Sequence, residues 1–91
     1  MIKNVYTVYD SKAEAYMTPW FVDKDGQALR EFSDVIKNPD TPFAKHPEDY
    51  TLFKIGTYDT DTAKMSALDT PVSMGVGIEH IQSELKEIKV S

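Results

Sequence analysis

The two histidines are the side chains of this sequence best suited to catalysis. His46 lies in a proline-rich segment, and His80 lies in an amphipathic segment near the C-terminus. Acid–base or nucleophilic catalysis needs such a group beside a nucleophile or a second titratable group. Neither histidine belongs to a motif of that kind, and the chain has no cysteine, which excludes thiolate chemistry and cysteine-ligated zinc. We therefore predict a protein that is not an enzyme, needs no cofactor and acts by binding.

Two acidic pairs could hold a hard cation. They are Asp23 with Asp25 and Asp59 with Asp61. Neither pair continues into the twelve-residue calcium loop with its terminal glutamate, so helix capping and hairpin-turn chemistry explain them better. Residues 75–77 contain two glycines but lack the rest of a dinucleotide or phosphate loop. We predict no metal and no nucleotide site.

Aromatic side chains are concentrated in the segments that we predict to be strands. Successive side chains of a strand point to opposite faces of a sheet, so one buried face cannot cover all of them. Exposed rings with basic groups among them form a surface on which single-stranded bases stack. The alternative is that the rings form core and cross-strand pairs. The candidate stacking residues are Tyr6, Tyr9, Tyr16, Trp20, Tyr50 and Tyr58, and the candidate phosphate contacts are Lys3, Lys12, Lys54 and Lys64.

The charge balance bears on this hypothesis. Fifteen acidic and ten basic residues give a net charge of −5, which repels phosphate at long range. Within residues 1–22 and 50–68, however, acidic and basic residues are equal in number. The excess negative charge lies in the other segments, so the net charge alone does not exclude single-strand binding by the sheet.

The first half of the chain predicts two strands and a helix. Residues 2–9 and 15–22 are rich in β-branched and aromatic side chains. Pro19 cannot donate to a sheet ladder, so the second strand needs an edge position or a bulge. Residues 23–26 offer an acidic N-cap, and apolar residues at helical spacing follow up to Ile36. The helix ends at Asn38 because Pro39 follows it.

The second half predicts the same order again. Residues 39–49 hold three prolines and form a long ordered loop. Residues 50–58 and 63–68 are predicted strands that a hairpin turn joins. Residues 69–71 resemble an N-cap followed by proline, and Ile78, Ile81, Leu85 and Ile88 follow at helical spacing. Gly75 and Gly77 disfavour a helix interior, so residues 71–77 form either a separate turn or an irregular start.

The predicted fold class is α+β. We expect one domain over residues 1–91 with the order ββαββα, a mainly antiparallel sheet and two helices on one face. The other face is then left for solvent or a partner. A domain this small buries only about 60–65% of its unfolded surface, which favours a homo-oligomer. No segment approaches the roughly 18 apolar residues of a membrane span, so we expect no membrane partner.

Residues 8–16, residues 45–53 with Ile55 and Gly56, and residues 70–75 resemble the small nonstructural protein of gokushovirus-type microviruses. The resemblance runs through most of the chain in the same order and at similar spacing. These viruses are small phages with circular single-stranded DNA. The resemblance implies an accessory protein in the cytoplasm of the infected bacterium, outside the capsid, that acts in genome replication or its coupling to packaging. It brings no catalytic residues.

Three partner classes stay open at this point. The first is single-stranded DNA, bound on the aromatic sheet face. The second is a protein, either a viral replication or capsid protein or a host factor, bound by an adaptor that never touches DNA. The third is a host factor that the acidic surface inhibits by resembling nucleic acid.

Overall fold

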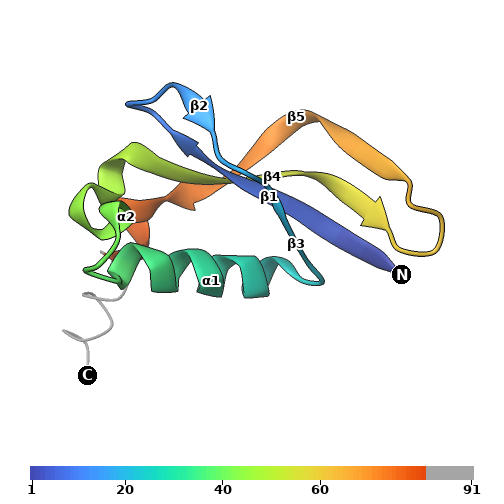
Figure 1. The fold of residues 1–91 in the computed structure, drawn as a ribbon, viewed down its shortest axis with the longest axis horizontal. Coiled ribbons are helices and arrows are strands. Elements are labelled where there is room, and N and C mark those ends of the chain that lie inside the picture. Colours follow the sequence, from blue (N-terminus) through green and yellow to red (C-terminus); the bar gives the residue numbers. More distant parts are fainter. Residues whose placement is uncertain (82–91) are drawn as a thin grey trace.

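The computed structural model describes residues 1–81. Its main feature is a five-stranded antiparallel sheet with helices against one face (Figure 1). This confirms the predicted α+β class. The elements in chain order are β1 (Ile2–Asp10), β2 (Ala15–Tyr16), β3 (Trp20–Val22), α1 (Asp25–Lys37), α2 (Pro42–Lys45), the 3-10 turn η1 (Pro47–Asp49), β4 (Tyr50–Asp59) and β5 (Met65–Val76).

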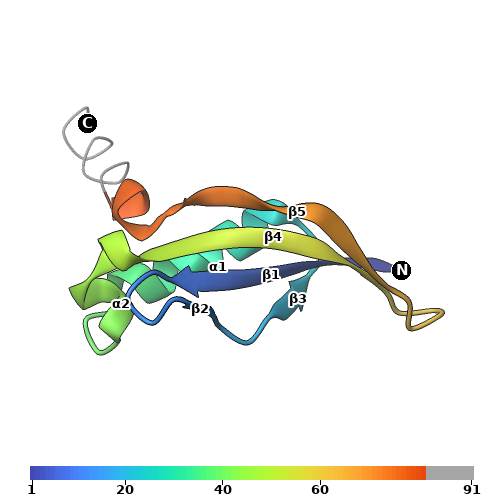
Figure 2. The ribbon, with the colours of Figure 1, turned by 90° about the horizontal axis from the view of Figure 1, so that it is seen from above.

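β1 is the strand around which the sheet is organised. It pairs with β4 along its whole length on one side, and with the short strands β2 and β3 on the other (Figure 2). The predicted strand over residues 15–22 is therefore split in two, and Met17, Thr18 and Pro19 lie between the parts. Pro19 has no N–H to donate, which explains the interruption. The predicted edge position is confirmed.

α1 packs its apolar stripe on the sheet, as its sequence pattern predicts. Ala28, Phe32 and Ile36 recur every four residues and are buried. They form one core cluster with strand residues that include Tyr6 and Leu52. We call the side of the sheet that α1 covers the helix face, and the opposite side the open face.

Strand alternation assigns side chains to these faces. Tyr6 and Val8 of β1 belong to the core under α1, so Val5 and Thr7 point toward the open face. β4 follows the same alternation up to Lys54, which is opposite Tyr6. The register then shifts, and Gly56 rather than Ile55 lies opposite Val5. Ile55 is the extra residue of a β-bulge, and it exchanges the faces of all the β4 residues that follow.

β5 corrects the sequence prediction. The fourth strand was expected to end at Leu68, with a helix cap at residues 69–71, but β5 continues to Val76. Val72 and Ser73 pair with Lys54 and Phe53 of β4. Between Ala67 and Val72 the chain arches away from β4 on the side of the open face (Figure 1). The cap prediction was wrong because backbone pairing with β4 outweighed a local pattern.

A helix begins at Gly77 and continues through Ile81. Ile81 and Met74 pack against the core cluster. The predicted helix also included Leu85 and Ile88, which lie outside the described residues. None of the helices in residues 1–81 has the length and apolar content that a membrane span requires.

The proline-rich segment is more regular than predicted. Pro42 and Pro47 each occupy the first turn of a short helix, α2 and η1. Proline fits there because the first helical N–H groups have no partner within the helix. Phe43 packs against the core cluster and anchors the segment.

Candidate functional site

The open face carries two groups of aromatic rings. In the first, Tyr9 and Tyr16 are cross-strand partners of β1 and β2, with ring centroids 4.8 Å apart. Tyr16 also contacts Phe53 of β4 edge to face, at 5.8 Å. The Tyr16 side chain is 54% exposed. This three-ring group therefore offers an aromatic surface to a partner.

The second group lies toward the other end of the sheet. Phe21 of β3 lies opposite Val5, and Tyr58 of β4 lies opposite Lys3. The two rings are 5.5 Å apart between centroids, and Phe21 is 45% exposed. Tyr58 reaches this face only because the bulge at Ile55 precedes it.

Two hollows lie on the open face, between the positions of the two ring groups along β1. The larger, of about 340 Å³, lies between the segment that joins β2 to β3 and the arch of β5. Thr7 and Ile55 line it from the sheet. Pro19 lines it from the segment between β2 and β3, and Pro71 lines it from the arch of β5. A smaller hollow of about 190 Å³ continues past Ile55 and Gly56 to Met65. The open face is thus an apolar trough between two aromatic groups.

Three of the six candidate aromatic residues lie on the helix face instead. Tyr6 is completely buried, and its hydroxyl donates to Asp25. It cannot stack on a base, so this expectation was wrong. Trp20 donates its indole N–H to Glu31 (2.8 Å), and Tyr50 packs on Phe43 with ring centroids 4.5 Å apart.

The tyrosines on the helix face have raised pKa values. Burial, followed by the hydrogen bond to Asp25, raises the pKa of Tyr6. Burial also raises the pKa of Tyr50, and the nearby charges of Asp10 and Asp49 add to the effect. Both hydroxyls therefore remain protonated at neutral pH.

The four candidate lysines do not form a basic rim. Lys3 pairs with Asp23 at 2.6 Å, and Lys54 lies on the helix face and pairs with Asp25 at 3.2 Å. Lys12 lies in the turn between β1 and β2, and Lys64 lies near the turn between β4 and β5. These turns are at opposite ends of β1, because Tyr50 pairs with Asp10 and Asp59 pairs with Ile2. Phosphate contacts from lysine are therefore few and widely separated.

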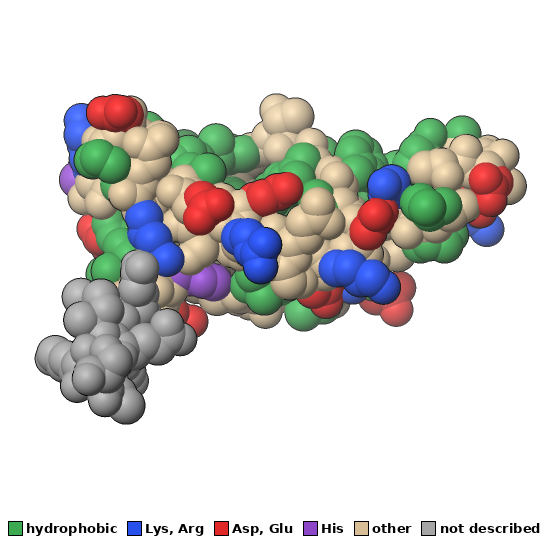
Figure 3. Space-filling model, turned by 90° about the horizontal axis from the view of Figure 1, so that it is seen from below, with side chains coloured by type: hydrophobic (Ala, Val, Ile, Leu, Met, Phe, Trp, Pro, Cys, Tyr) green, Lys and Arg blue, Asp and Glu red, His purple; other side chains and the backbone are tan. Residues whose placement is uncertain are grey.

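The helix face has a different character. Figure 3 shows lysine, arginine and carboxylate side chains interspersed over it. Charges of both signs over a helix are typical of a surface that faces water. The open face is therefore the better candidate for the predicted stacking surface.

The acidic pairs serve local structure. Asp59 and Asp61 both contact the N-terminal ammonium group, at 3.6 and 2.7 Å. The Asp61 backbone N–H donates to Asp59 and lowers the pKa of that carboxyl, as a hairpin turn predicts. The predicted acidic N-cap of α1 was wrong, since Lys24 occupies the cap and no side chain caps the helix.

One cluster of ligand-type side chains was missed by the sequence prediction. His46, Glu48 and Asp49 place one ligand atom each within 4.8 Å of one another. They follow one another closely in the sequence, and this closeness was the signal from which the cluster could have been predicted. His46 and Glu48 are exposed, and exposed acidic groups of this kind are common without an ion, so we assign no metal to them.

A family model described as Phage ORF5 protein matches residues 3–80, which is most of the chain. No curated protein and no solved structure matches it. The match agrees with the phage origin that the sequence resemblance implied.

Proposed function

Because this chain belongs to the Phage ORF5 protein family, we propose that it is a non-enzymatic, nonstructural accessory protein of a single-stranded DNA phage of the gokushovirus type. It works in the cytoplasm of the infected bacterium, in genome replication or in coupling replication to packaging. It does so by binding single-stranded DNA on the open face of its sheet.

The observation that carries this proposal is the set of rings on that face. Tyr9, Tyr16 and Phe53 form one group, and Phe21 and Tyr58 form the other. Stacking of one base on an aromatic side chain contributes about 1–3 kcal/mol and tolerates any base sequence. Lys3 and Tyr9 are six residues apart in β1, which corresponds to about 20 Å along a strand. The trough is therefore long enough for several nucleotides.

The ion pairs of two candidate lysines limit the contribution of phosphate contacts to DNA binding. Lys3 and Lys54 are already neutralised by aspartates, so phosphate contacts contribute little. Affinity then comes from stacking and from the apolar trough. We expect modest affinity, little sequence preference and a weak dependence on salt.

The test is a titration of a labelled oligothymidine with the protein, followed by anisotropy at low and moderate salt. Trp20 is the only tryptophan and lies on the helix face, so its emission should stay unchanged when DNA binds the open face. Saturable binding that Tyr16→Ala weakens supports the proposal. No binding at low salt refutes it.

A second candidate function is protein binding by the same face. The observation that favours it is the lack of a basic rim together with exposed apolar side chains such as Met17 and Met65. The partner would be a viral replication or capsid protein, a host factor or a second copy of the chain. Light scattering distinguishes the last of these: a dimer that Tyr16→Glu dissociates, with no oligonucleotide binding, supports protein binding over DNA.

A further inference from the structure

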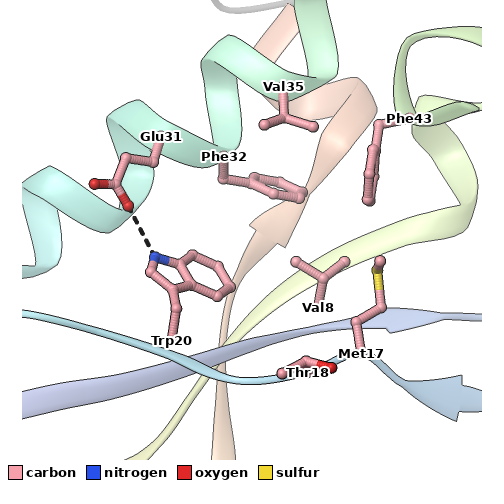
Figure 4. Close-up of a pocket in the computed structure, with 8 residues that line it drawn as sticks. All are labelled: Val8, Met17, Thr18, Trp20, Glu31, Phe32, Val35 and Phe43. Atoms are coloured by element: carbon pink, nitrogen blue, oxygen red, sulfur yellow. Dashed lines mark hydrogen bonds between the residues drawn. The ribbon is translucent and has the colours of Figure 1, made fainter. Parts of the chain in front are cut away.

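A third hollow lies under α1, outside the proposed DNA surface (Figure 4). Its volume is about 280 Å³. Phe32 and Val35 point into it from α1, Phe43 from α2, and Trp20 from β3 (Figure 4). Val8 of β1 lies beside them. We call this hollow the α1 pocket.

The interruption between β2 and β3 opens the pocket at the edge of the sheet. Met17 and Thr18 line it there, in the segment that leaves the β-ladder next to Pro19. Met17 and Val35 are both partly exposed at the pocket. Phe32 is buried and forms the floor, whereas Phe43 is only partly buried, so an apolar group approaching from solvent can reach Phe43 without any strand separating.

Glu31 is the only charged side chain of the lining. Its carboxylate accepts the Trp20 indole N–H at 2.8 Å. No lysine, arginine or histidine within residues 1–81 lies at ion-pair distance from it. Asp34 is three residues further along α1, and residues at this spacing are neighbours on a helix surface. The pocket is thus apolar inside, and Glu31 is the one carboxylate among the described residues of its lining.

We propose that the α1 pocket binds a segment of a partner protein that carries one aromatic or branched apolar side chain next to a lysine or arginine. The apolar side chain fills the pocket, and the cation pairs with Glu31. A buried anchor with a charged neighbour is the usual arrangement at an interface hot spot. The net charge of −5 favours the approach of a basic segment.

The size of the α1 pocket argues against a small-molecule ligand, and its charge argues against a nucleotide. Pockets for small-molecule ligands usually measure about 300–1,000 Å³, and this one is slightly smaller, so a single side chain suits it better. A nucleotide would bring phosphate toward Glu31 and Asp34. The α1 pocket lies on the helix side of the sheet and the trough on the open face, and Met17 at the sheet edge lines both. With both sites the chain could join the genome to a basic partner.

The test uses three short synthetic peptides: a phenylalanine flanked by lysines, the same phenylalanine flanked by glutamates, and an alanine flanked by lysines. None contains tryptophan, so the emission of Trp20 reports occupancy of the pocket directly. We expect a saturable change with the first peptide below about 1 mM. The glutamate-flanked peptide should bind at least threefold more weakly, roughly the contribution of one exposed ion pair. The alanine peptide should also bind at least threefold more weakly, because it lacks the apolar side chain that fills the pocket.

Substitutions in and outside the α1 pocket test whether the peptide binds there. Glu31→Gln keeps an acceptor for the Trp20 N–H but removes the charge, and it should lower affinity for the first peptide about threefold. Glu48→Gln is the matched control, since Glu48 is exposed and is not part of the pocket lining, and it should change nothing. Val35→Phe should narrow the pocket and abolish the response while the circular dichroism spectrum is retained, and it leaves Trp20 as the only tryptophan.

Three outcomes overturn the proposal. The first is no change in Trp20 emission with the lysine–phenylalanine peptide. The second is equal affinity for the lysine- and glutamate-flanked peptides. The third is a dimer by sedimentation that Val35→Phe converts to a monomer, because the occupant would then be a second copy. Oligothymidine binding is measured on the same samples, so failure here is distinguished from failure of the DNA proposal.

Discussion

The hydroxyl of Tyr6 donates a hydrogen bond to the carboxylate of Asp25. The same Asp25 oxygen lies 3.2 Å from the Lys54 ammonium group. One carboxylate at the start of α1 therefore connects the helix to β1 and to β4. No side chain caps α1, and this connection helps the buried Ala28 to hold the first turn of the helix on the sheet.

Tyr6→Phe should destabilise the protein by about 1 kcal/mol at neutral pH, since it removes one hydrogen bond to a partly exposed charged group. The pKa of Tyr6 is raised in the folded state. The associated stability is complete below about pH 10, the ordinary tyrosine value, and is lost as the pH rises above it. Urea unfolding of both proteins between neutral and alkaline pH tests this, and an equally steep alkaline loss in Tyr6→Phe would contradict it.

Asp25→Asn should change the dependence of stability on acidic pH. The hydrogen bond from Tyr6, with a smaller contribution from Lys54, lowers the pKa of Asp25. A lowered pKa gives stability that is present above about pH 4 and is lost as the pH falls below it. The wild type should therefore lose more stability on acidification than Asp25→Asn. Thermal unfolding between acidic and neutral pH measures the difference, with Glu48→Gln as an exposed control.

Gly56→Ala should destabilise the sheet. A Cβ at this position would collide with the backbone oxygen of Ser66, so β4 and β5 would have to separate. The expected loss is about 1–3 kcal/mol, typical of overpacking. Gly26→Ala is the matched control, because nothing lies within 4 Å of its Cβ and alanine favours a helix. Denaturant unfolding should rank Gly26→Ala at or above the wild type.

Tyr16→Ala should weaken oligothymidine binding by about 1–3 kcal/mol, the contribution of one stacked base. Tyr16 is mostly exposed, so its loss should leave the fold intact. Val35→Ala removes a partly exposed apolar side chain from α1 and should leave DNA affinity unchanged. Anisotropy titrations measure both, and equal losses in the two variants would show that the open face is not the DNA surface.

Salt should affect DNA binding only weakly. With Lys3 and Lys54 in ion pairs, Lys12 and Lys64 are the remaining candidate phosphate contacts. Two contacts correspond to less than about a tenfold loss of affinity between about 50 and 200 mM salt. A loss of a hundredfold or more in the same titration would mean that other basic residues contact the phosphates.

The sequence predicted correctly those helices and strands whose hydrophobic pattern lies entirely within the element itself. α1 has a full apolar stripe from Ala28 to Ile36 and a terminating Pro39, and it was predicted correctly. β4 alternates clearly and was also found. β5 was cut short because residues 69–71 match a helix start, whereas pairing of Val72 and Ser73 with β4 depends on residues distant in the sequence.

The aromatic surface could be predicted only in part. Alternation within β1 separates Tyr6 from Tyr9, but it does not say which of them is buried until α1 is placed. In β4, Tyr50 and Tyr58 are eight residues apart, and perfect alternation would put both on one face. The bulge at Ile55 puts them on opposite faces. Gly56 beside it is a residue type that often marks a bulge, but a glycine does not by itself show which residue is the extra one. The pairing of Lys3 and Lys54 with aspartates likewise depends on tertiary structure.

The bulge at Ile55 also determines where the family can change length. Loss of Ile55 would restore strict alternation in β4, turn Tyr58 from the open face to the helix face, and exchange inside for outside as far as Asp59. Gain or loss of a residue in the exposed turn at residues 60–64 has no such effect. Relatives should therefore differ in length at this turn while the spacing between Leu52 and Tyr58 stays constant.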